Sequence, residues 1–365
     1  MTKSRQLLTT DYGLRTIMIR VPNWVGDAVM AVPALRELRR VFGDARITLV
    51  ARPWVAGLFE GEELADTLIP VHDAQGFVHT ARNFIREARL LRRERFDLAV
   101  LLQNAIGAAL LARAAGAKTI AGYPTDSRRS LLNFVVPFEQ DRKRAHQVRY
   151  YLNIAAELEQ KLTGSSRVDM ETLRPQLRVG RDQREGASLM LEESGVRTDA
   201  GPILALCPGA TNSRAKRWPA DRFAATADRL AEQNGFQTII VGTGGDVEVA
   251  EEVARRMRSR AAVLAGRTNI ADLKAVLACT SLVISNDTGT AHVAAALGVP
   301  TAVVFGPTEH VSTRPLSGAA TVVRHDVECS PCMLRDCPID HRCMTRVEVD
   351  DVYCAAQDLL VRAAR

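Results

Sequence analysis

An acidic side chain stands near the start of the chain in an otherwise apolar segment. The segment VPNWVGDAVMAVP follows an expected strand, Thr16–Arg20, and Asp27 is its only acidic residue. A carboxylate at this point can act as a general base that takes a proton from a reacting hydroxyl group. It can equally cap a helix expected over residues 27–42, which is a common use of aspartate. The position of Asp27 alone leaves both interpretations open.

A second segment, CPGATNSRAKRWP, offers small polar groups and cations just before an expected helix. Thr211 and Asn212 provide hydrogen-bond donors, and Lys216 provides a positive charge. Such groups at a helix start suit a phosphate. The alternative is a solvated loop in which Trp218 and Pro219 form an ordinary helix entry. The spacing is not that of a P-loop.

A third segment, SNDTGTAHVAAALG, passes from an apolar strand into an Ala-rich helix. The backbone N–H groups at Thr288 and Gly289 can hold a diphosphate at the helix N-terminus. Asp287 is either a ligand group or the N-cap of the helix. His292 lies four residues after Thr288 on the same helical face, so it is either a ligand neighbour or a satisfied core histidine.

A fourth segment, VGTGGDVEVAEEV, places Glu248 after another strand end and a Gly-rich loop. The carboxylate of Glu248 can bind ribose hydroxyls, or it can belong to a solvated acidic first turn favoured by the helix dipole. Hydrogen-bond donors that suit phosphate, together with a cation and a carboxylate on three such loops, fit a nucleotide-sugar site. Hydride transfer fits poorly, because no GxGxxG fingerprint follows an N-terminal strand.

Two basic segments lie in the first half of the chain. In ARNFIREARLLRRERFD, arginines at helical spacing accompany an apolar face, which indicates either a solvated face of a packed helix or a membrane-contacting one. These arginines are Arg82, Arg86, Arg89 and Arg93. In PTDSRRSLLNF, Arg128 and Arg129 are expected in a loop, where they can bind phosphate or carboxylate groups; in the family resemblance described below, these groups belong to the acceptor.

Four cysteines lie close together near the C-terminus. Cys329, Cys332, Cys337 and Cys343 have the spacing C-x₂-C-x₄-C-x₅-C. Four soft ligands within fifteen residues can close a structural zinc or iron–sulfur site. Because the spacing is not a standard zinc knuckle, reduced structural thiols are the alternative. No signal peptide is expected, so a disulfide framework is not predicted.

The elements that must position these groups alternate between strands and helices. Strands are expected at Thr16–Arg20, Arg46–Ala51, 67–71, 97–103 and Thr119–Gly122, and the second half repeats the pattern in PILALC, QTIIV, AAVLAG, SLVIS and TAVVF. This alternation predicts parallel sheets covered by helices, the α/β class. The loops quoted above then lie at the carboxyl ends of the strands, where ligands of such sheets bind.

Length and composition predict a globular protein of two domains. The chain has 365 residues, 47% of them hydrophobic and 25% charged, with a net charge of +6. The apolar periodicity weakens after residue 163, which suggests domains at residues 1–170 and 171–345 and a C-terminal helix within 346–365 that packs back on the first domain. No apolar run has the length of a spanning helix, so a cytoplasmic location is expected. The modest net charge does not indicate a nucleic-acid partner.

In combination and order, the segments VPNWVGDAVMAVPALRELR, CPGATNSRAKRWP, SNDTGTAHVAAALGVPTAVVFGPT and CSPCMLRDCPIDHRCM resemble the bacterial lipopolysaccharide heptosyltransferases of glycosyltransferase family 9. The resemblance runs from about residue 16 to the C-terminal helix. It implies a GT-B fold, in which two Rossmann-like domains face each other across a cleft. The N-terminal domain would bind the acceptor and the C-terminal domain ADP-heptose.

The resemblance also implies roles for individual residues. Asp27 corresponds to the proposed base, and Lys216 to a lysine that contacts the donor phosphates, with Thr211 and Asn212 beside it. Some relatives carry threonine where this chain has Asn212. The remaining implied donor-binding residues are Asp287 on heptose hydroxyls, Thr288 and Gly289 on phosphate, His292 close by, and Glu248 on ribose.

The implied reaction is inverting transfer of L-glycero-D-manno-heptose from ADP-heptose to the heptosyl-Kdo₂-lipid A inner core, with no metal required for catalysis. The expected partners are ADP-heptose, the lipid-linked acceptor and, transiently, the cytoplasmic face of the inner membrane. Alternatives within the family act on the inner Kdo residue or on a protein. A non-catalytic nucleotide-binding module is a further alternative, although it would not need Asp27.

Overall fold

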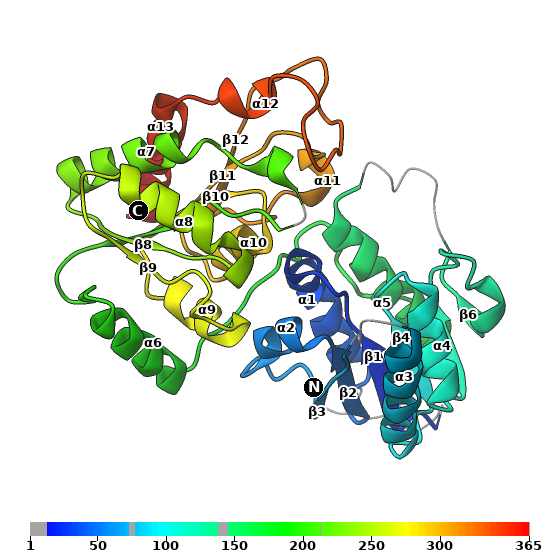
Figure 1. Ribbon diagram of the computed structural model, residues 1–365. Helices are drawn as coiled ribbons and strands as arrows, with labels where there is room; N and C mark the ends of the chain where they lie inside the picture. The colour runs from blue at the N-terminus through cyan, green and yellow to red at the C-terminus, as the bar shows by residue number, and fades with distance from the viewer. Residues whose placement is uncertain (1–12, 73–76, 138–144, 212, 365) are drawn as a thin grey trace. The chain divides into compact units, whose positions relative to one another are not determined.

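The computed structural model describes residues 13–72, 77–137, 145–211 and 213–364, and the side chains of residues 77–80 lie outside this description (Figure 1). The chain forms two compact units, Met1–Pro175 and Gln176–Arg365. Within the described residues, each unit is built on a parallel sheet of six strands. This arrangement agrees with the α/β class expected from the alternating pattern.

The sheet of the first unit has the strand order β3-β2-β1-β4-β5-β6. Its strands are β1 (Thr16–Arg20), β2 (Arg46–Ala51), β3 (Thr67–Pro70), β4 (Leu98–Leu101), β5 (Thr119–Gly122) and β6 (Phe134–Val135). The strand order reverses between β1 and β4, which are neighbours. In open α/β sheets a ligand crevice forms at such a switch point, beside the carboxyl ends of the strands. The loop that leaves β1 at this point leads into α1 (Val25–Val41), whose first turn contains Asp27.

Helices cover both faces of the first sheet. They are α1 (Val25–Val41), α2 (Pro53–Ala56), α3 (Phe77–Arg92), α4 (Ile106–Ala114) and α5 (Gln147–Thr163), with short 3₁₀ turns η1 (Gly57–Phe59) and η2 (Arg129–Leu131). Helices α3 and α4 contact each other and pack on Met18, Ala99 and Leu101. The neighbouring side chain Ile17 points to the opposite face and is equally buried. Helix α1 packs mainly against α5.

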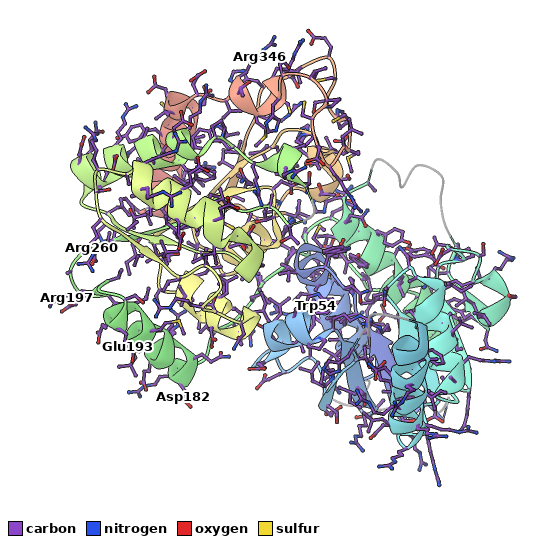
Figure 2. The ribbon with its side chains drawn as sticks, in the orientation of Figure 1. Trp54, Asp182, Glu193, Arg197, Arg260 and Arg346 are labelled. Atoms are coloured by element: carbon purple, nitrogen blue, oxygen red, sulfur yellow. The ribbon has the colours of Figure 1, made fainter. Side chains whose placement is uncertain are left out.

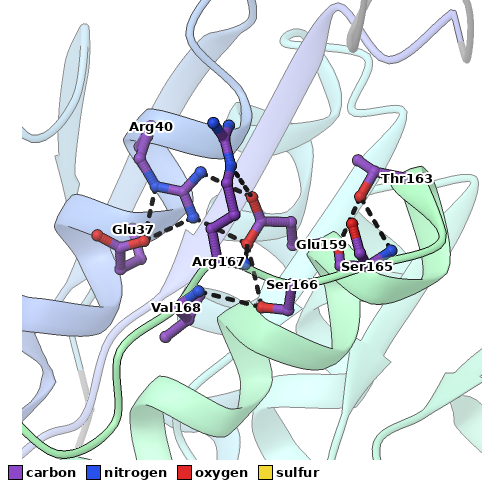
Figure 3. Close-up of polar contacts among 8 residues, drawn as sticks. All are labelled: Glu37, Arg40, Glu159, Thr163, Ser165, Ser166, Arg167 and Val168. Atoms are coloured by element: carbon purple, nitrogen blue, oxygen red, sulfur yellow. Dashed lines mark hydrogen bonds and ion pairs between the residues drawn. The ribbon is translucent and has the colours of Figure 1, made fainter.

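A buried carboxylate joins α1 to α5 and to the chain that follows α5 (Figure 3). The guanidinium of Arg40 donates to both oxygens of Glu159, at 2.7 and 2.8 Å. Glu159 also accepts from the hydroxyl of Ser166 and the backbone N–H of Arg167. Burial alone would raise the pKa of Glu159, but these hydrogen bonds lower it to about 2. The carboxylate therefore stays charged and fixes the end of the first unit.

The sheet of the second unit has the order β12-β11-β10-β7-β8-β9. Its strands are β7 (Ile203–Cys207), β8 (Gln237–Ile240), β9 (Ala261–Val263), β10 (Leu282–Asn286), β11 (Thr301–Val304) and β12 (Ala320–Val323). The switch point lies between β7 and β10. The segments CPGATNSRAKRWP and NDTG begin at the ends of these two strands. Both candidate phosphate segments therefore lie at the carboxyl end of the same sheet.

Most strands of the second unit are followed by a helix. The helices are α6 (Arg181–Glu193), α7 (Ala220–Asn234), α8 (Val247–Arg256), α9 (Ile270–Leu277), α10 (Gly289–Ala296), α11 (His310–Thr313), α12 (Arg342–Thr345) and α13 (Val349–Ala363), with η4 (Arg214–Lys216) and η5 (Gly244–Asp246). No helix within the described part of the chain combines the length and apolar character needed to cross a bilayer.

The C-terminal helix α13 packs within the second unit. It contacts α7, β10, β11 and β12, and its residues Val352, Ala356 and Leu359 belong to that unit's core. The guanidinium of Arg229 on α7 stacks over the ring of Tyr353 at 3.7 Å. The apolar face of α13 thus completes the core of the second unit beside β11 and β12. The expectation that residues 346–365 also pack on the first domain stays a prediction.

Candidate active site

Asp27 lies in the first turn of α1, where Trp24 is the N-cap residue and makes no side-chain capping bond. Asp27 therefore is not the N-cap, although its charge still favours the helix N-terminus. The hydroxyl of Tyr151, on α5, donates to Oδ1 of Asp27 at 3.2 Å. Burial and the neighbouring Asp27 carboxylate hold the pKa of Tyr151 well above its ordinary value. Tyr151 thus remains a neutral donor that orients the half-buried carboxylate.

A buried arginine holds the loop that leads to Asp27. Arg20, at the end of β1, donates to the backbone carbonyl oxygens of Val21 and Val50, both at 3.0 Å, and to the side chain of Asn23 at 2.8 Å. The indole N–H of Trp54, labelled in Figure 2, donates to the carbonyl of Asn23 at 2.8 Å. These contacts fix the backbone just before α1. Sequence reasoning missed Arg20, because a charged residue inside a strand gives no local sign of what it will bind.

Arg128 and Arg129 have different environments although they are adjacent. Arg128 has no exposed surface, and its guanidinium donates to the carbonyl oxygens of Tyr123, at 2.9 Å, and of Gln103. It also donates to the side chain of Asn104 at 3.2 Å. This guanidinium therefore holds together the loops after β4 and β5, and a contact between Arg128 and an acceptor stays a prediction. Arg129 is exposed, and its role in acceptor binding stays a prediction.

In the second unit, Lys216 and Asp287 form an ion pair. Nζ of Lys216 lies 2.8 Å from Oδ2 of Asp287 and also donates to the Asp287 carbonyl oxygen at 3.3 Å. The hydroxyl of Thr308 donates to Oδ2 of Asp287 at 2.7 Å. Asp287 is buried and Lys216 is partly exposed. The structure thus brings together a cation and a carboxylate that the sequence analysis assigned to the same ligand.

Asn286 connects the two loops that carry this pair. Its side chain has no exposed surface, donates to the carbonyl oxygen of Pro208 at 2.8 Å, and accepts from the backbone N–H of Trp218 at 3.0 Å. Trp218 is itself buried, and its indole N–H donates to the carbonyl of Val347 at 2.9 Å. The position of Lys216 is therefore set by hydrogen bonds on both sides of its loop.

The N-terminus of α10 lies directly after the ion pair. Thr288 is the N-cap residue and makes no side-chain capping bond, and Gly289 begins the helix. The hydroxyl of Thr288 lies 3.2 Å from that of Ser285. The N-terminal N–H groups of the helix thus keep no side-chain cap, as an anion site requires. His292 is buried in the same helix, and its role in donor binding stays a prediction.

Asp246, two residues before Glu248, is a buried acid at the carboxyl end of the same sheet. It accepts from the hydroxyl and backbone N–H of Thr243, at 2.7 and 3.0 Å, and lies 3.8 Å from the guanidinium of Arg217. A Cβ at Gly209 would lie 2.2 Å from Cγ of Asp246. The sequence alone could not reveal the role of Asp246, because that role depends on the close approach of the loops that carry Gly209 and Asp246.

The remaining predicted donor residues are only partly described. Glu248 is exposed in the first turn of α8, and Thr211 is exposed in the loop after β7. Asn212 lies outside the described residues. The assignment of Glu248 to ribose and of Thr211 and Asn212 to phosphate therefore stays a prediction.

The structure does not support a metal at the C-terminal cysteines. Cys329 and Cys332 are exposed, whereas Cys343 is buried. Burial, followed by the neighbouring thiols, raises the pKa of Cys343 to about 11. Across residues 13–72, 77–137, 145–211 and 213–364, no group of three or more His, Cys, Asp or Glu side chains is arranged to hold a metal.

The family model described as glycosyltransferase family 9 (heptosyltransferase) matches residues 84–342, more than half of the chain. The chain belongs to glycosyltransferase family 9. It is therefore a glycosyltransferase, as the motifs at the strand ends predicted, and an oxidoreductase is excluded.

Individual members of family 9 resemble the chain over most of its length. It is 29% identical to lipooligosaccharide heptosyltransferase 2 of Haemophilus influenzae over 312 residues, which cover 84% of this chain and 88% of that protein. It is 28% identical to lipopolysaccharide heptosyltransferase 2 of Escherichia coli, with coverage of 84% and 87%. The solved structure of E. coli ADP-heptose lipopolysaccharide heptosyltransferase II superposes with a TM-score of 0.80 at 25% identity, covering 96% of this chain and all of that one. The two parallel sheets thus form the GT-B fold of this family.

Proposed function

We propose that this family 9 chain transfers L-glycero-D-manno-heptose from ADP-heptose to the heptosyl-Kdo₂-lipid A inner core, with inversion at the anomeric carbon. Family membership and the relatives named heptosyltransferase 2 support this choice of donor and acceptor. The observation that carries the proposal is the Lys216–Asp287 pair beside the uncapped N-terminus of α10. A cation and free N–H groups suit a diphosphate, and a carboxylate suits sugar hydroxyls.

In the proposed mechanism, Asp27 accepts the proton of the acceptor hydroxyl as its oxygen attacks C1 of the heptose. The new glycosidic bond forms on the face opposite to the ADP group, and the bond from C1 to the diphosphate oxygen breaks. The hydrogen bond from Tyr151 supports this role, because it fixes the orientation of the carboxylate. A general base of this kind contributes about 10²–10⁴-fold to the rate.

The leaving ADP gains negative charge as the bond to C1 breaks. Lys216 and the backbone N–H groups of Thr288 and Gly289 are suited to stabilise that charge, because they are held in place before the reaction. Asp287 would then accept hydrogen bonds from heptose hydroxyls. The proposal includes no catalytic metal, since Lys216 supplies the positive charge, and no structural metal at the cysteines.

The acceptor in this proposal is anchored in a membrane by its lipid A part. The enzyme would therefore act at the cytoplasmic face of the inner membrane and bind it transiently. Arg129 is the exposed cation from the sequence analysis that we assign to anionic groups of the acceptor.

The test is transfer from ADP-heptose to defined Kdo₂-lipid A, with and without the first heptose. We expect product only with the heptosylated acceptor, identified by mass spectrometry and by the anomeric configuration of the new bond in NMR spectra. Product with unheptosylated Kdo₂-lipid A would indicate that the chain catalyses the first heptose transfer. Activity on neither acceptor would contradict the proposed function.

A further inference from the structure

One face of α3 combines exposed arginines with exposed aliphatic side chains. The arginines are Arg82, Arg86, Arg89 and Arg93, the last just beyond the helix end, and the aliphatic side chains are Ile85 and Leu90. At 100° per residue these six positions fall within about 140° of the helix circumference. We call this set the arginine face. The opposite side of α3, with Ala88 and Leu91, is buried on the sheet.

Among the described residues, no side chain neutralises the charges of the arginine face. None of its four guanidinium groups has an ion pair or side-chain hydrogen bond with a described residue, unlike Arg40 or Arg128. Glu87, the acid nearest in sequence, lines the same hollow as these arginines, but it is buried and its carboxylate accepts from the backbone N–H of His72. Four positive charges along about three turns of a helix repel one another, so the described part of the fold gives no reason to collect them there.

The exposed aliphatic residues distinguish the arginine face from an ordinary solvated helix face. Ile85 is 48% exposed and Leu90 is 45% exposed, on either side of the arginine row. Helix α4, which lies beside α3 (Figure 1), exposes Ile106 and Leu110. The outer surface of these two helices thus offers both cations and apolar contacts, as surfaces that rest on lipid headgroups do.

We infer that the arginine face docks the chain on a bilayer rich in anionic phospholipid. The inference rests on the proposed function to the extent that a lipid-linked acceptor requires a docked enzyme. The arginines lie along the centre of the face and the aliphatic groups at its margins, so the helix rests among phosphate headgroups and does not enter the acyl region. Attraction between cations and anionic lipid therefore provides most of the binding, and salt weakens it.

The experiment is sedimentation of the full chain with phosphatidylcholine vesicles that contain or lack phosphatidylglycerol. The wild type is expected to bind only the anionic vesicles and to lose binding as salt is raised. The double variant Arg86→Gln/Arg89→Gln is expected to bind about 30-fold more weakly, from about a kcal/mol per arginine. The variant Ile85→Ser/Leu90→Ser should bind more weakly by a smaller factor and keep the salt dependence.

The matched control is Arg260→Gln/Arg346→Gln, which removes the same charge from exposed positions of the second unit (Figure 2). It should bind vesicles like the wild type. Equal loss in both double variants, or no binding of the wild type to anionic vesicles, would overturn the inference. Transfer to an acceptor dispersed in neutral detergent distinguishes the two proposals, because no bilayer is present. The variant Arg86→Gln/Arg89→Gln should have wild-type turnover in this assay. Absence of turnover in the wild type would contradict only the proposed function.

Discussion

The ammonium nitrogen of Lys216 lies 2.8 Å from a carboxylate oxygen of Asp287, although 71 positions separate the two residues in the chain. The first follows β7 and the second follows β10, and these strands are neighbours in the sheet. The pair therefore places a cation for phosphate and an acceptor for sugar hydroxyls side by side. Each charge also offsets the cost of keeping the other partly out of water.

Lys216→Gln should weaken ADP-heptose binding and slow transfer. The variant removes the cation and leaves the buried Asp287 carboxylate with the hydrogen bond from the Thr308 hydroxyl. We expect kcat/KM for ADP-heptose to fall about 10²–10³-fold, as when one charge-stabilising group is removed from an active site. Calorimetric titration with ADP measures the binding part directly. As a control, Arg255→Gln removes an exposed charge from α8 and should leave both quantities unchanged; a Lys216→Gln enzyme with wild-type kinetics would remove Lys216 from the site.

Asp27→Ala should abolish turnover and retain donor binding, because Asp27 belongs to the first unit whereas the predicted donor groups belong to the second. We expect kcat to fall by about 10²–10⁴-fold. Tyr151→Phe keeps the buried ring and loses only the donor to Asp27. It should lower kcat by about tenfold, with the dissociation constant for ADP unchanged. Turnover of Asp27→Ala close to that of the wild type would exclude the base role.

Replacing the adjacent arginines should separate stability from acceptor binding. Arg128→Met leaves the carbonyl oxygens of Tyr123, Gln103 and Ala105 without this donor, and we expect a loss of about 3 kcal/mol in the free energy of unfolding of the first unit. Arg129→Gln changes an exposed side chain and should unfold like the wild type, with a higher KM for the acceptor. Urea denaturation and acceptor kinetics measure the two effects. Equal stability of both variants would contradict the structural role of Arg128.

The Glu159 carboxylate should make the first unit sensitive to acid. Its pKa is lowered from 4.5 to about 2 in the folded chain, so protonation is easier after unfolding. The stabilisation is therefore fully present above pH 4.5 and is lost as the pH falls towards 2, up to about 3 kcal/mol. Glu159→Gln should lose stability at pH 7 and approach the wild type near pH 3, as measured by urea denaturation. Glu185→Gln breaks an exposed pair with Arg181 and should cost less than about 0.5 kcal/mol.

Gly209→Ala should disturb the donor side of the second unit. The added Cβ would meet the Asp246 side chain at 2.2 Å, so Asp246 must move away from Thr243 and Arg217. We expect a loss of about 1–3 kcal/mol in stability together with weaker ADP binding. Gly244→Ala is the control, because a Cβ there meets no atom within 4 Å. The double variant Gly209→Ala/Asp246→Gly should recover part of the stability if the clash is the cause.

The strands and the order of the loops followed from the sequence. Thr16–Arg20, Arg46–Ala51 and Thr119–Gly122 are apolar, β-branched runs with clear ends, and the structure has the same bounds. The two strands that were not predicted, β6 and β12, lie at the sheet edges. Phe134–Val135 is too short to show a pattern, and Ala320–Val323 is only partly buried, so its apolar signal is weak.

The sequence alone determined the α/β class, the family motifs and which loops stand at the carboxyl ends of the strands, because periodicity and turn residues act over a few positions. Only the tertiary structure decided which side chains of those loops are free to meet a ligand. Arg128 and Arg129 are neighbours with the same chemistry, yet one is buried on carbonyl oxygens and the other is exposed. Asp246 meets Gly209, and Tyr151 meets Asp27, across long stretches of chain. Burial depends on such remote contacts, which no local pattern records.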